Sequence, residues 1–327
     1  MLNSGGDSLI GESAQRQKLQ LNIVEGILLK LASAIMFAVM QALVRALGEA
    51  IPVGQVVFFR SAFAVIPVVV IYALRHELYA AIHTKRPLGH VGRGLVGVAG
   101  MFFNFAALAR LPLAEVTAIS FASPLVTVAL AALMLKERVR IYRWSAVGVG
   151  FLGVIVMLAP HLDPHQLASH TPAQTVGAVL ALAAAFSNAG AVIQTRRLTD
   201  TETTSSIVLY FSLVCAAGGL LTLPFGWVMP TAWELGALIA TGLLGGAAHL
   251  VLTHSYRYAP ASVLAPYDYT AILFVFVIGY FAFGEVPTIV VIAGAAIVVA
   301  AGLFVLWRER QLGLQRARDA EGPPSGA

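Results

Sequence analysis

The chain has 327 residues, of which 58% are hydrophobic and only 11% are charged, and its mean hydropathy is +0.82. A soluble domain carries roughly a quarter charged residues, so this composition excludes a soluble globular protein and predicts an all-α polytopic membrane protein. The only cysteine, Cys215, excludes an intrachain disulfide and a cysteine metal cluster, and the net charge of +5 must first be divided between the two sides of the membrane.

Ten apolar segments follow one another, each close to the length of about 20 residues that a helix needs to cross a bilayer. The segment before them, residues 1–22, is polar and has no cleavable signal-peptide pattern, and the segment after them, 308–327, is basic and then expected to be disordered. The sequence therefore predicts ten transmembrane helices, at 23–46, 50–74, 88–109, 113–135, 142–160, 173–195, 205–229, 231–255, 262–283 and 286–307.

One stretch of the sequence occurs twice. The frame from Pro112 to Glu137 recurs 148 residues later, from Pro260 to Glu285, and the pair Gly94/Gly242 keeps the same offset. Each copy then belongs to a unit of five spans, and an odd number of crossings places the second unit upside down relative to the first. The predicted architecture is two inverted five-helix repeats, at 23–160 and 173–307.

The positions of lysine and arginine predict the orientation. Of the 21 Lys and Arg residues, 16 fall in the segments on the side of both termini, two fall on the other side and three lie inside spans. Positive charge accumulates on the cytoplasmic side of membrane proteins. We therefore expect a multi-pass protein of the cytoplasmic (inner) membrane with both termini in the cytoplasm.

The inverted repeats favour a secondary transporter, because two similar bundles of opposite orientation provide two states of nearly equal energy, one open to each side. An integral membrane enzyme is one alternative, but HExxH, GxSxG and GxxxxGK[ST] motifs are absent from the sequence. A channel is another, but no filter-like segment is present. The prediction is a carrier that works by alternating access and is not an enzyme.

Three cations lie inside predicted spans: Lys30, Arg60 and Arg93. An ionised side chain costs about 3 kcal/mol or more at the centre of a bilayer unless it faces protein or water. Arg60 is too deep to reach an interface easily, so it is expected to face the bundle interior, either as a ligand for an anionic substrate group or in a structural contact. Lys30 and Arg93 lie nearer the span ends, and snorkelling is the favoured interpretation for both.

Asp268 is the one carboxylate well inside a predicted span. Three roles stay open for it: an ion pair with Arg60 or Lys30, a contact to the substrate, or proton transfer. His249 is interpreted as a packing residue in preference to a proton relay. The excess of cations favours a substrate with a carboxylate, a phosphate or an electron-rich ring. The expected substrate-binding residues are Arg60, Asp268, Tyr267, Tyr269, Lys30, Asn104, Asn188 and His249, with Gln41, Gln55 and Tyr210 as further lining.

The repeated glutamates Glu137 and Glu285 are expected to be structural, because each ends a span where a carboxylate can cap a helix. Metal binding by the histidines near His165 is a weaker interpretation than a solvated loop, so neither a metal site nor a cofactor is expected. The expected partners are a small-molecule substrate and membrane lipid, and not nucleic acid; the sequence leaves a homodimer open.

The two repeated stretches also resemble a known family. LARLPLAEVTAISFASPLVTVALAALMLKERVRIYRWSAVGVGFLGVIVM and HSYRYAPASVLAPYDYTAILFVFVIGYFAFGEVPTIVVIAGAAIVVAAGLFV are similar to the paired EamA modules of the drug/metabolite transporter superfamily. The resemblance covers roughly residues 23–307 and implies a ten-helix transporter of small organic solutes. Relatives export amino acids and metabolites or import compounds such as S-adenosylmethionine or riboflavin, and the substrate of this chain does not follow from the motif.

Overall fold

The computed structural model describes residues 4–74, 76, 79, 82–134, 136, 140–162, 172–199, 201–259 and 261–321. All regular structure in these ranges is helical. The elements, in chain order, are α1 (Ser4–Leu47), α2 (Val53–Leu74), α4 (Pro87–Arg110), α5 (Leu113–Ser120), α6 (Ala122–Met134), α7 (Ile141–Leu162), α8 (Pro172–Thr199), α9 (Thr204–Leu220), η1 (Leu223–Phe225), α10 (Ala232–Tyr258), α11 (Ala261–Leu264), η2 (Ala265–Thr270), α12 (Ala271–Phe283) and α13 (Ile289–Glu321).

The helices have the length and composition of membrane spans. Nine described helical segments are long and apolar enough to cross a bilayer, and the apolar part of α9, Ser205–Leu220, is a shorter tenth. Each satisfies its backbone hydrogen bonds internally, as lipid requires, and large apolar side chains such as Leu152 and Phe281 remain exposed on the outer surface. The chain is therefore a multi-pass membrane protein. Helix α13 extends to Glu321, and the expectation for the rest of the tail falls on residues outside the described ranges.

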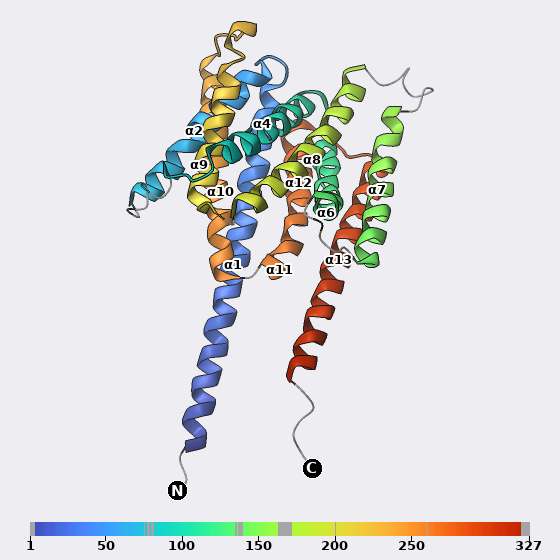
Figure 1. Ribbon diagram of the computed structural model, residues 1–327. Helices are drawn as coiled ribbons and strands as arrows, with labels where there is room; N and C mark the ends of the chain where they lie inside the picture. The colour runs from blue at the N-terminus through green and yellow to red at the C-terminus, as the bar shows by residue number, and fades with distance from the viewer. Residues whose placement is uncertain are drawn as a thin grey trace.

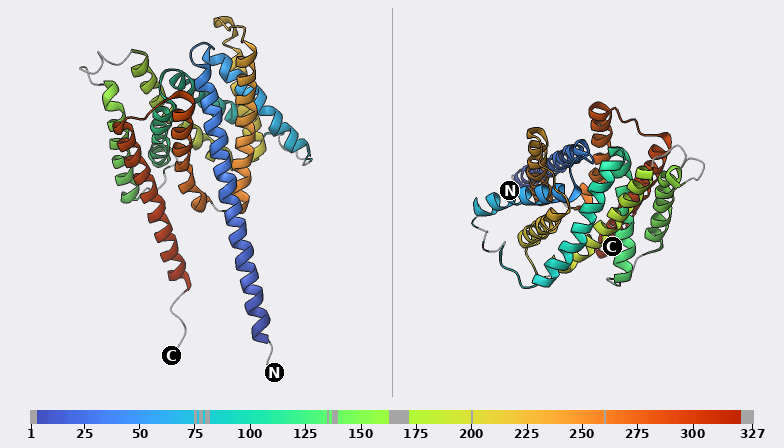
Figure 2. Two further views of the ribbon diagram at one scale, coloured as in Figure 1. Left: turned by 180° about the vertical axis from the view of Figure 1, so that it is seen from behind. Right: turned by 90° about the horizontal axis from the view of Figure 1, so that it is seen from above.

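Both termini lie at the same end of the bundle, where α1 and α13 project beyond the other helices (Figure 1, Figure 2). We call this end the terminal face and the opposite end the far face. Helices α4 and α9 begin at the terminal face, and α8 ends there, whereas α1 and α4 reach the far face at Leu47 and Arg110. The positions of these helix ends define the direction in which each cavity extends.

The two repeats interlock. Helix α10 packs against α1 and α2, and helix α4 packs against α8 and α9, so the third span of each repeat lies against the first two spans of the other. Equivalent glycines make these contacts: a Cβ atom on Gly94 would lie 2.5 Å from Val214 of α9, and one on Gly242 would lie 2.4 Å from Phe63 of α2. Close approach at small residues is the usual basis of helix association in lipid. The predicted inverted five-helix repeats are confirmed.

The fourth and ninth spans, which are equivalent in the two repeats, are both interrupted. The fourth breaks at Phe121 between α5 and α6, and the ninth passes through the 3-10 helix η2 before α12. Pro124 and Pro266 lie at these interruptions, where a missing N–H is tolerated in the first turn of a helix. The rings of Phe121 and Tyr269, 148 residues apart, pack with centroids 5.3 Å apart. The two breaks therefore meet at the repeat interface.

An ion-pair cluster at the far face joins α1, α4, α5 and the connection after α12. Arg45 Nε donates to Glu285 Oε1 at 3.0 Å, and the backbone N–H of Leu113 donates to Oε2 at 2.8 Å. Glu285 thus has the expected structural role, but it caps α5 rather than the helix that follows it. We call the pair Arg45–Glu285 the far-face latch. Glu137 and Pro260 lie outside the described residues.

Candidate functional site

The interior of the bundle contains two adjoining cavities between α1, α2, α4, α8, α9 and α10. The first chamber, of about 180 Å³, extends along α2, α8 and α9 toward the terminal face. The second chamber, of about 320 Å³, extends toward the far face along α1 and α4. Both are lined by Arg60, Arg93, Phe211 and His249. The second chamber is at the lower end of the range of cavities that hold small organic ligands, about 300–1,000 Å³, and the first chamber adjoins it.

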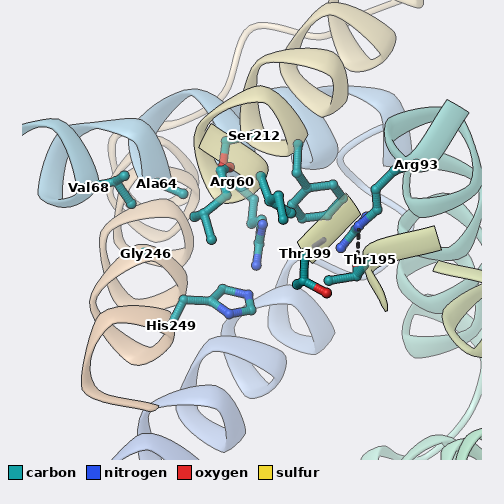
Figure 3. Close-up of a pocket in the computed structure, with 12 residues that line it drawn as sticks. Arg60, Ala64, Val68, Arg93, Thr195, Thr199, Ser212, Gly246 and His249 are labelled. Carbon is teal, nitrogen blue, oxygen red and sulfur yellow. Dashed lines mark hydrogen bonds between the residues drawn. The ribbon is translucent and has the colours of Figure 1, made fainter. Parts of the chain in front are cut away.

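Arg60 projects from α2 into this space, and only 5% of its surface is exposed (Figure 3). Gly245 of α10 makes room for the guanidinium, because a Cβ atom there would lie 3.2 Å from Arg60 Nε. That Nε has no hydrogen-bond partner among the described residues. The interior position expected for Arg60 is confirmed; its role toward a substrate stays a prediction.

Arg93 enters the same space from α4 (Figure 3). Its Nε donates to Thr195 Oγ1 at 2.9 Å, and the guanidinium carbon lies 4.1 Å from the ring centroid of Phe211. A Cβ atom on Gly97, one turn deeper in the span, would lie 2.5 Å from Arg93 Nη1. The guanidinium therefore points into the bundle, and the interpretation of Arg93 as a snorkelling residue is wrong.

Within the described part of the chain, no carboxylate pairs with Arg60 or Arg93; the ion pairs there are Lys30–Asp268, Arg45–Glu285, His90–Glu202 and Glu49–Arg110. Arg93 Nη1, like Arg60 Nε, is buried without a hydrogen-bond partner among these residues. A buried charge without a counterion is costly unless a ligand or water compensates it. The pair of guanidiniums is thus suited to an anion that enters the cavity.

Amide and hydroxyl groups complete the second chamber. Asn104 of α4 and Asn188 of α8 line it, together with Gln41 of α1 and Ser120 at the end of α5. His249 lies below Arg60 in Figure 3 and packs edge-on against Phe37 with ring centroids 4.9 Å apart; its role stays a prediction. Of the eight predicted substrate-binding residues, the structure brings four together here: Arg60, Asn104, Asn188 and His249.

Lys30 and Asp268 form a separate pair. Lys30 Nζ lies 2.5 Å from Asp268 Oδ1, and the exposed fractions of the two side chains are 4% and 56%. Lys30 Nζ also donates to the hydroxyl of Tyr256 at 3.4 Å. Of the partners considered for Asp268, the structure therefore shows Lys30 and not Arg60. Because Lys30 is buried, the interpretation that it snorkels is wrong.

Asp268 lines a third cavity, of about 450 Å³, between the interrupted spans and α13. We call it the interrepeat chamber, and its lining includes Phe121, Pro124, Leu125, Asp268, Tyr269 and Gly302. Ser120 lines both this chamber and the second chamber, so the two adjoin.

Three candidate residues lie elsewhere. Tyr267 is half-buried in η2 and does not line these three chambers. Gln55 binds the backbone of Val228 near the far face, with Nε2 donating to its carbonyl oxygen at 3.0 Å. Tyr210 stacks on His90 near the terminal face, with ring centroids 4.7 Å apart. The expectation that Gln55 and Tyr210 line the central cavity is wrong.

Sequence reasoning missed Thr195 and Phe211, the two residues that hold Arg93. Single threonines and phenylalanines in apolar spans give no signal of this kind. The spacing of Arg93 and Gly97 was a usable signal, because a glycine four residues after a buried cation leaves space on the same helix face. The equivalent glycine of the second repeat, Gly245, lies against Arg60, which belongs to the first repeat.

Toward the far face, the ends of α1 and α4 and the start of α5 pack against one another. The leucines there are buried, at most 3% exposed: Leu47, Leu108, Leu111 and Leu113. In the other direction, a cavity of about 370 Å³ continues from Arg93 along the α8 residues Thr195 and Thr199. The described residues contain no group of three or more His, Cys, Asp or Glu side chains placed to hold a metal ion; His165 lies outside them.

Several bacterial transporters are similar to this chain over most of its length. The S-adenosylmethionine uptake transporter of Rickettsia prowazekii (strain Madrid E) is 30% identical, over 88% of this chain and 94% of its own length. The pseudopaline exporter of Pseudomonas aeruginosa is 31% identical over 84% and 94%, and the riboflavin transporter of Vibrio cholerae is 27% identical over 86% and 93%. One solved crystal structure matches with a TM-score of 0.59 at 20% identity, over 85% of this chain and 95% of that chain, which shows the fold alone.

A sequence model of the EamA-like transporter family matches residues 24–159 and 175–307, which together make up most of the chain. The matched stretches coincide with the two interlocked sets of spans that enclose the cavity. The protein therefore belongs to the EamA-like transporter family of the drug/metabolite transporter superfamily, and it is a small-metabolite transporter.

Proposed function

We propose that this transporter is a secondary carrier that binds the carboxylate, or another anionic group, of a small organic solute between Arg60 and Arg93. The observation that carries the proposal is the pair of buried guanidiniums that line one cavity with no carboxylate partner among the described residues. A guanidinium presents planar donors that match a carboxylate or phosphate. Asn104 and Asn188 then orient the rest of the solute through their amides.

The charge of the two guanidiniums is compensated both in the empty carrier, by water, and in the occupied carrier, by the solute. In the empty carrier, water solvates the guanidiniums through the opening toward the terminal face. An anionic solute replaces this water and brings charge-assisted hydrogen bonds of about 1.5–3 kcal/mol each. The occupied site then carries a smaller net charge, so its passage between the two open states avoids exposing bare cations to a low-dielectric interior.

The protein is proposed to lie in the cytoplasmic membrane with both termini in the cytoplasm, as the lysine and arginine distribution indicates. The terminal face is then the cytoplasmic side, and the described state is open inward. The relatives named for uptake and for export support carriers of both directions, so the direction here follows from the gradients.

The test is binding to the purified full-length protein, measured by thermal shift and titration calorimetry. The panel contains S-adenosylmethionine, free amino acids, organic acids and riboflavin, and the proteins are wild type, Arg60→Gln and Arg93→Gln. We expect at least one carboxylate to bind, with a Kd at least about tenfold weaker in either variant, because each loses a charge-assisted hydrogen bond.

Arg110→Gln is the matched control, because Arg110 pairs with Glu49 at the far face, outside the cavity. Its affinity for the same carboxylate should equal that of the wild type. Equal affinity in Arg60→Gln and Arg93→Gln would overturn the anion site. So would a panel in which every ligand that binds lacks an anionic group.

A further inference from the structure

The interrepeat chamber has the position of a substrate site. It lies where the two interrupted, repeat-equivalent spans meet, and the equivalent residues Phe121 and Tyr269 form part of its wall. Interrupted helices at the interface of inverted repeats are where carriers place their substrates, because irregular backbone within the membrane is stable only beside protein or a cavity. This chamber is larger than either central chamber.

Resting on the carrier function proposed above, we propose that the interrepeat chamber is a second subsite, which holds a planar ring of the same solute whose anionic group lies between Arg60 and Arg93. The ring is flat and largely apolar, and it carries an N–H or amino donor that binds the carboxylate of Asp268. The substrate class is therefore an elongated solute with an anionic group at one end and a donor-bearing ring at the other.

The composition of the chamber supports a ring. Phe121, Pro124 and Leu125, with valine and leucine side chains of α13, form an apolar wall, and the rings of Phe121 and Tyr269 offer aromatic surface. A volume of about 450 Å³ is within the range of cavities that hold small organic ligands. An anionic group alone would find no cation here other than Lys30, which Asp268 already binds.

The surroundings of Asp268, at the edge of the chamber, favour a ring with a neutral hydrogen-bond donor over a ring with a positive charge. Lys30 neutralises Asp268 through Oδ1, so the pair carries no net charge. More than half of the Asp268 side chain is nevertheless exposed, and a carboxylate accepts several hydrogen bonds. An exposed acceptor beside an apolar wall is suited to the N–H groups at the rim of a ring.

The contact between the two cavities supports a single ligand. Ser120, the last residue of α5, lines both the second chamber and the interrepeat chamber, so the two meet at this residue. The proposed solute lies across Ser120, with its anionic group at the guanidiniums and its ring beside Asp268. The repeat partner of Ser120 is Asp268 itself, 148 residues later, so the asymmetry between the two repeats lies at this junction.

Gly302 of α13 provides a variant that acts on this chamber alone. The hydroxyl of Tyr269 lies against Gly302, in the space that a Cβ atom would occupy, so Gly302→Ala displaces the Tyr269 ring. Gly148 of α7 is the matched control, because a Cβ atom there would have nothing within 4 Å. Both substitutions replace a helical glycine by alanine, so their intrinsic effects on the helix are alike.

The experiment compares carboxylates with and without a donor-bearing ring: tryptophan against alanine, which differ by an indole, and S-adenosylmethionine against methionine, which differ by an adenosyl group on a sulfonium. We expect wild type and Gly148→Ala to bind the ring-bearing member of at least one pair about tenfold more tightly. Gly302→Ala should remove this difference and leave the affinity of the ringless member unchanged. Equal affinities within both pairs in the wild type would overturn the subsite.

A second measurement covers the case in which Gly302→Ala fails to fold. Ser123, which lines the interrepeat chamber, is replaced by cysteine in a Cys215→Ala background and labelled with a charged methanethiosulfonate reagent. The ring-bearing member should protect this cysteine at least about tenfold more than its ringless partner does at equal occupancy. Equal protection, or labelling by apolar reagents only, would overturn the subsite, the latter because a lipid chain then fills the chamber.

The two proposals fail separately. Loss of methionine or alanine binding in Arg60→Gln tests the anion site, whereas the difference within each pair tests the ring subsite. If the ringless carboxylates depend on Arg60 but the ring adds nothing, the proposed function stands and the subsite is wrong. If ring-bearing solutes bind equally well in wild type and Arg60→Gln, the anion site is wrong.

Discussion

At the scale of single residues, the two central arginines depend on glycines that occupy equivalent positions. Gly97 and Gly245 are 148 residues apart, and each lies against one guanidinium, Arg93 and Arg60 respectively. The arginines themselves are not repeat equivalents, since they come from the third and second spans. The inverted repeat therefore supplies two similar spaces, and the sequence fills each with a cation from a different helix.

Alanine at either glycine should weaken anion binding without unfolding the bundle. In Gly97→Ala the new methyl group would lie 2.5 Å from Arg93 Nη1, and in Gly245→Ala it would lie 3.2 Å from Arg60 Nε, so the guanidinium must move. We expect the Kd for a bound carboxylate to rise about tenfold for Gly97→Ala, where the contact is closer, and less for Gly245→Ala. Calorimetry with the carboxylate identified in the panel measures both.

The same two helices offer matched controls. A Cβ atom on Gly92 of α4 or Gly236 of α10 would have nothing within 4 Å. Gly92→Ala and Gly236→Ala should bind the carboxylate as the wild type does. If they weaken binding as much as the substitutions at Gly97 and Gly245, the effect comes from the helix backbone and not from the guanidinium.

The candidate site was only partly predictable from the sequence. Depth in the span identified Arg60, because a cation that cannot reach an interface must face the interior. Depth in the span predicted the wrong direction for Arg93. This residue is close enough to the span end to snorkel, but its guanidinium points deeper into the span, toward Gly97. The direction of a side chain depends on the neighbouring helices, here on Thr195 and Phe211, and the sequence alone does not place these beside it.

At the scale of elements, a carboxylate outside the spans joins α4 to the turn between α8 and α9 at the terminal face. Glu202 Oε1 accepts a hydrogen bond from the backbone N–H of Lys85 at 2.8 Å, and its Oε2 lies 3.3 Å from Nε2 of His90. Ser206 at the start of α9 also donates to Oε2, at 3.5 Å. Burial raises the pKa of Glu202, but hydrogen bonds, first among them the one from the backbone N–H of Lys85, outweigh it and hold the pKa below its ordinary value of 4.5.

This contact should make the stability of the terminal face depend on pH in the acid range. Because the folded-state pKa of Glu202 is lowered, its contribution is fully present above about pH 4.5 and is lost as the pH falls through the folded-state value. The unfolding temperature of Glu202→Gln should thus lie below that of the wild type at pH 7, and the gap should narrow below pH 4.5. A gap that stays constant from pH 7 to pH 3.5 contradicts the assignment.

The elements themselves were largely predictable, and their interruptions were not. Ten apolar segments gave ten helical spans, because lipid leaves a helix little alternative. The sequence places Pro124 and Pro266 in the fourth and ninth spans, but it does not predict the break at Phe121 or the 3-10 geometry from Ala265 to Thr270. Those features depend on contacts between the two repeats, such as the packing of Phe121 on Tyr269. Hydropathy, which averages over about 20 residues, does not resolve them.

At the scale of the whole molecule, the described state has one closed face. Buried leucines, including Leu47 and Leu111, pack at the far-face ends of α1 and α4, and the far-face latch Arg45–Glu285 lies on the same side. Glu285 also caps α5, so the latch connects the interrupted fourth span to α1. In an inverted-repeat carrier the second state opens this face, and the latch must break for that to happen.

Removing the latch should therefore shift the population toward the state open at the far face. The variant is Arg45→Ala with Glu285→Gln, and the reporter is Met101→Cys, on the second chamber, in a Cys215→Ala background. A membrane-impermeant thiol reagent is applied to the far face of oriented vesicles. We expect labelling about tenfold faster than with the latch intact, since the charge-assisted bond contributes about 1.5 kcal/mol or more to the closed state.

Glu49→Gln is the control at the same face. Glu49 pairs with Arg110 at 3.4 Å, but 62% of its side chain is exposed, and exposed ion pairs contribute little. Glu49→Gln should leave the labelling rate unchanged, because the loss of the Glu49–Arg110 pair disturbs neither α5 nor the buried leucines at the far face. In the latch variant, labelling from the terminal face should fall as labelling from the far face rises, because molecules that open at the far face are no longer open at the terminal face. A rise on the far face with no fall on the terminal face would mean that the variant opens both sides at once, which contradicts alternating access.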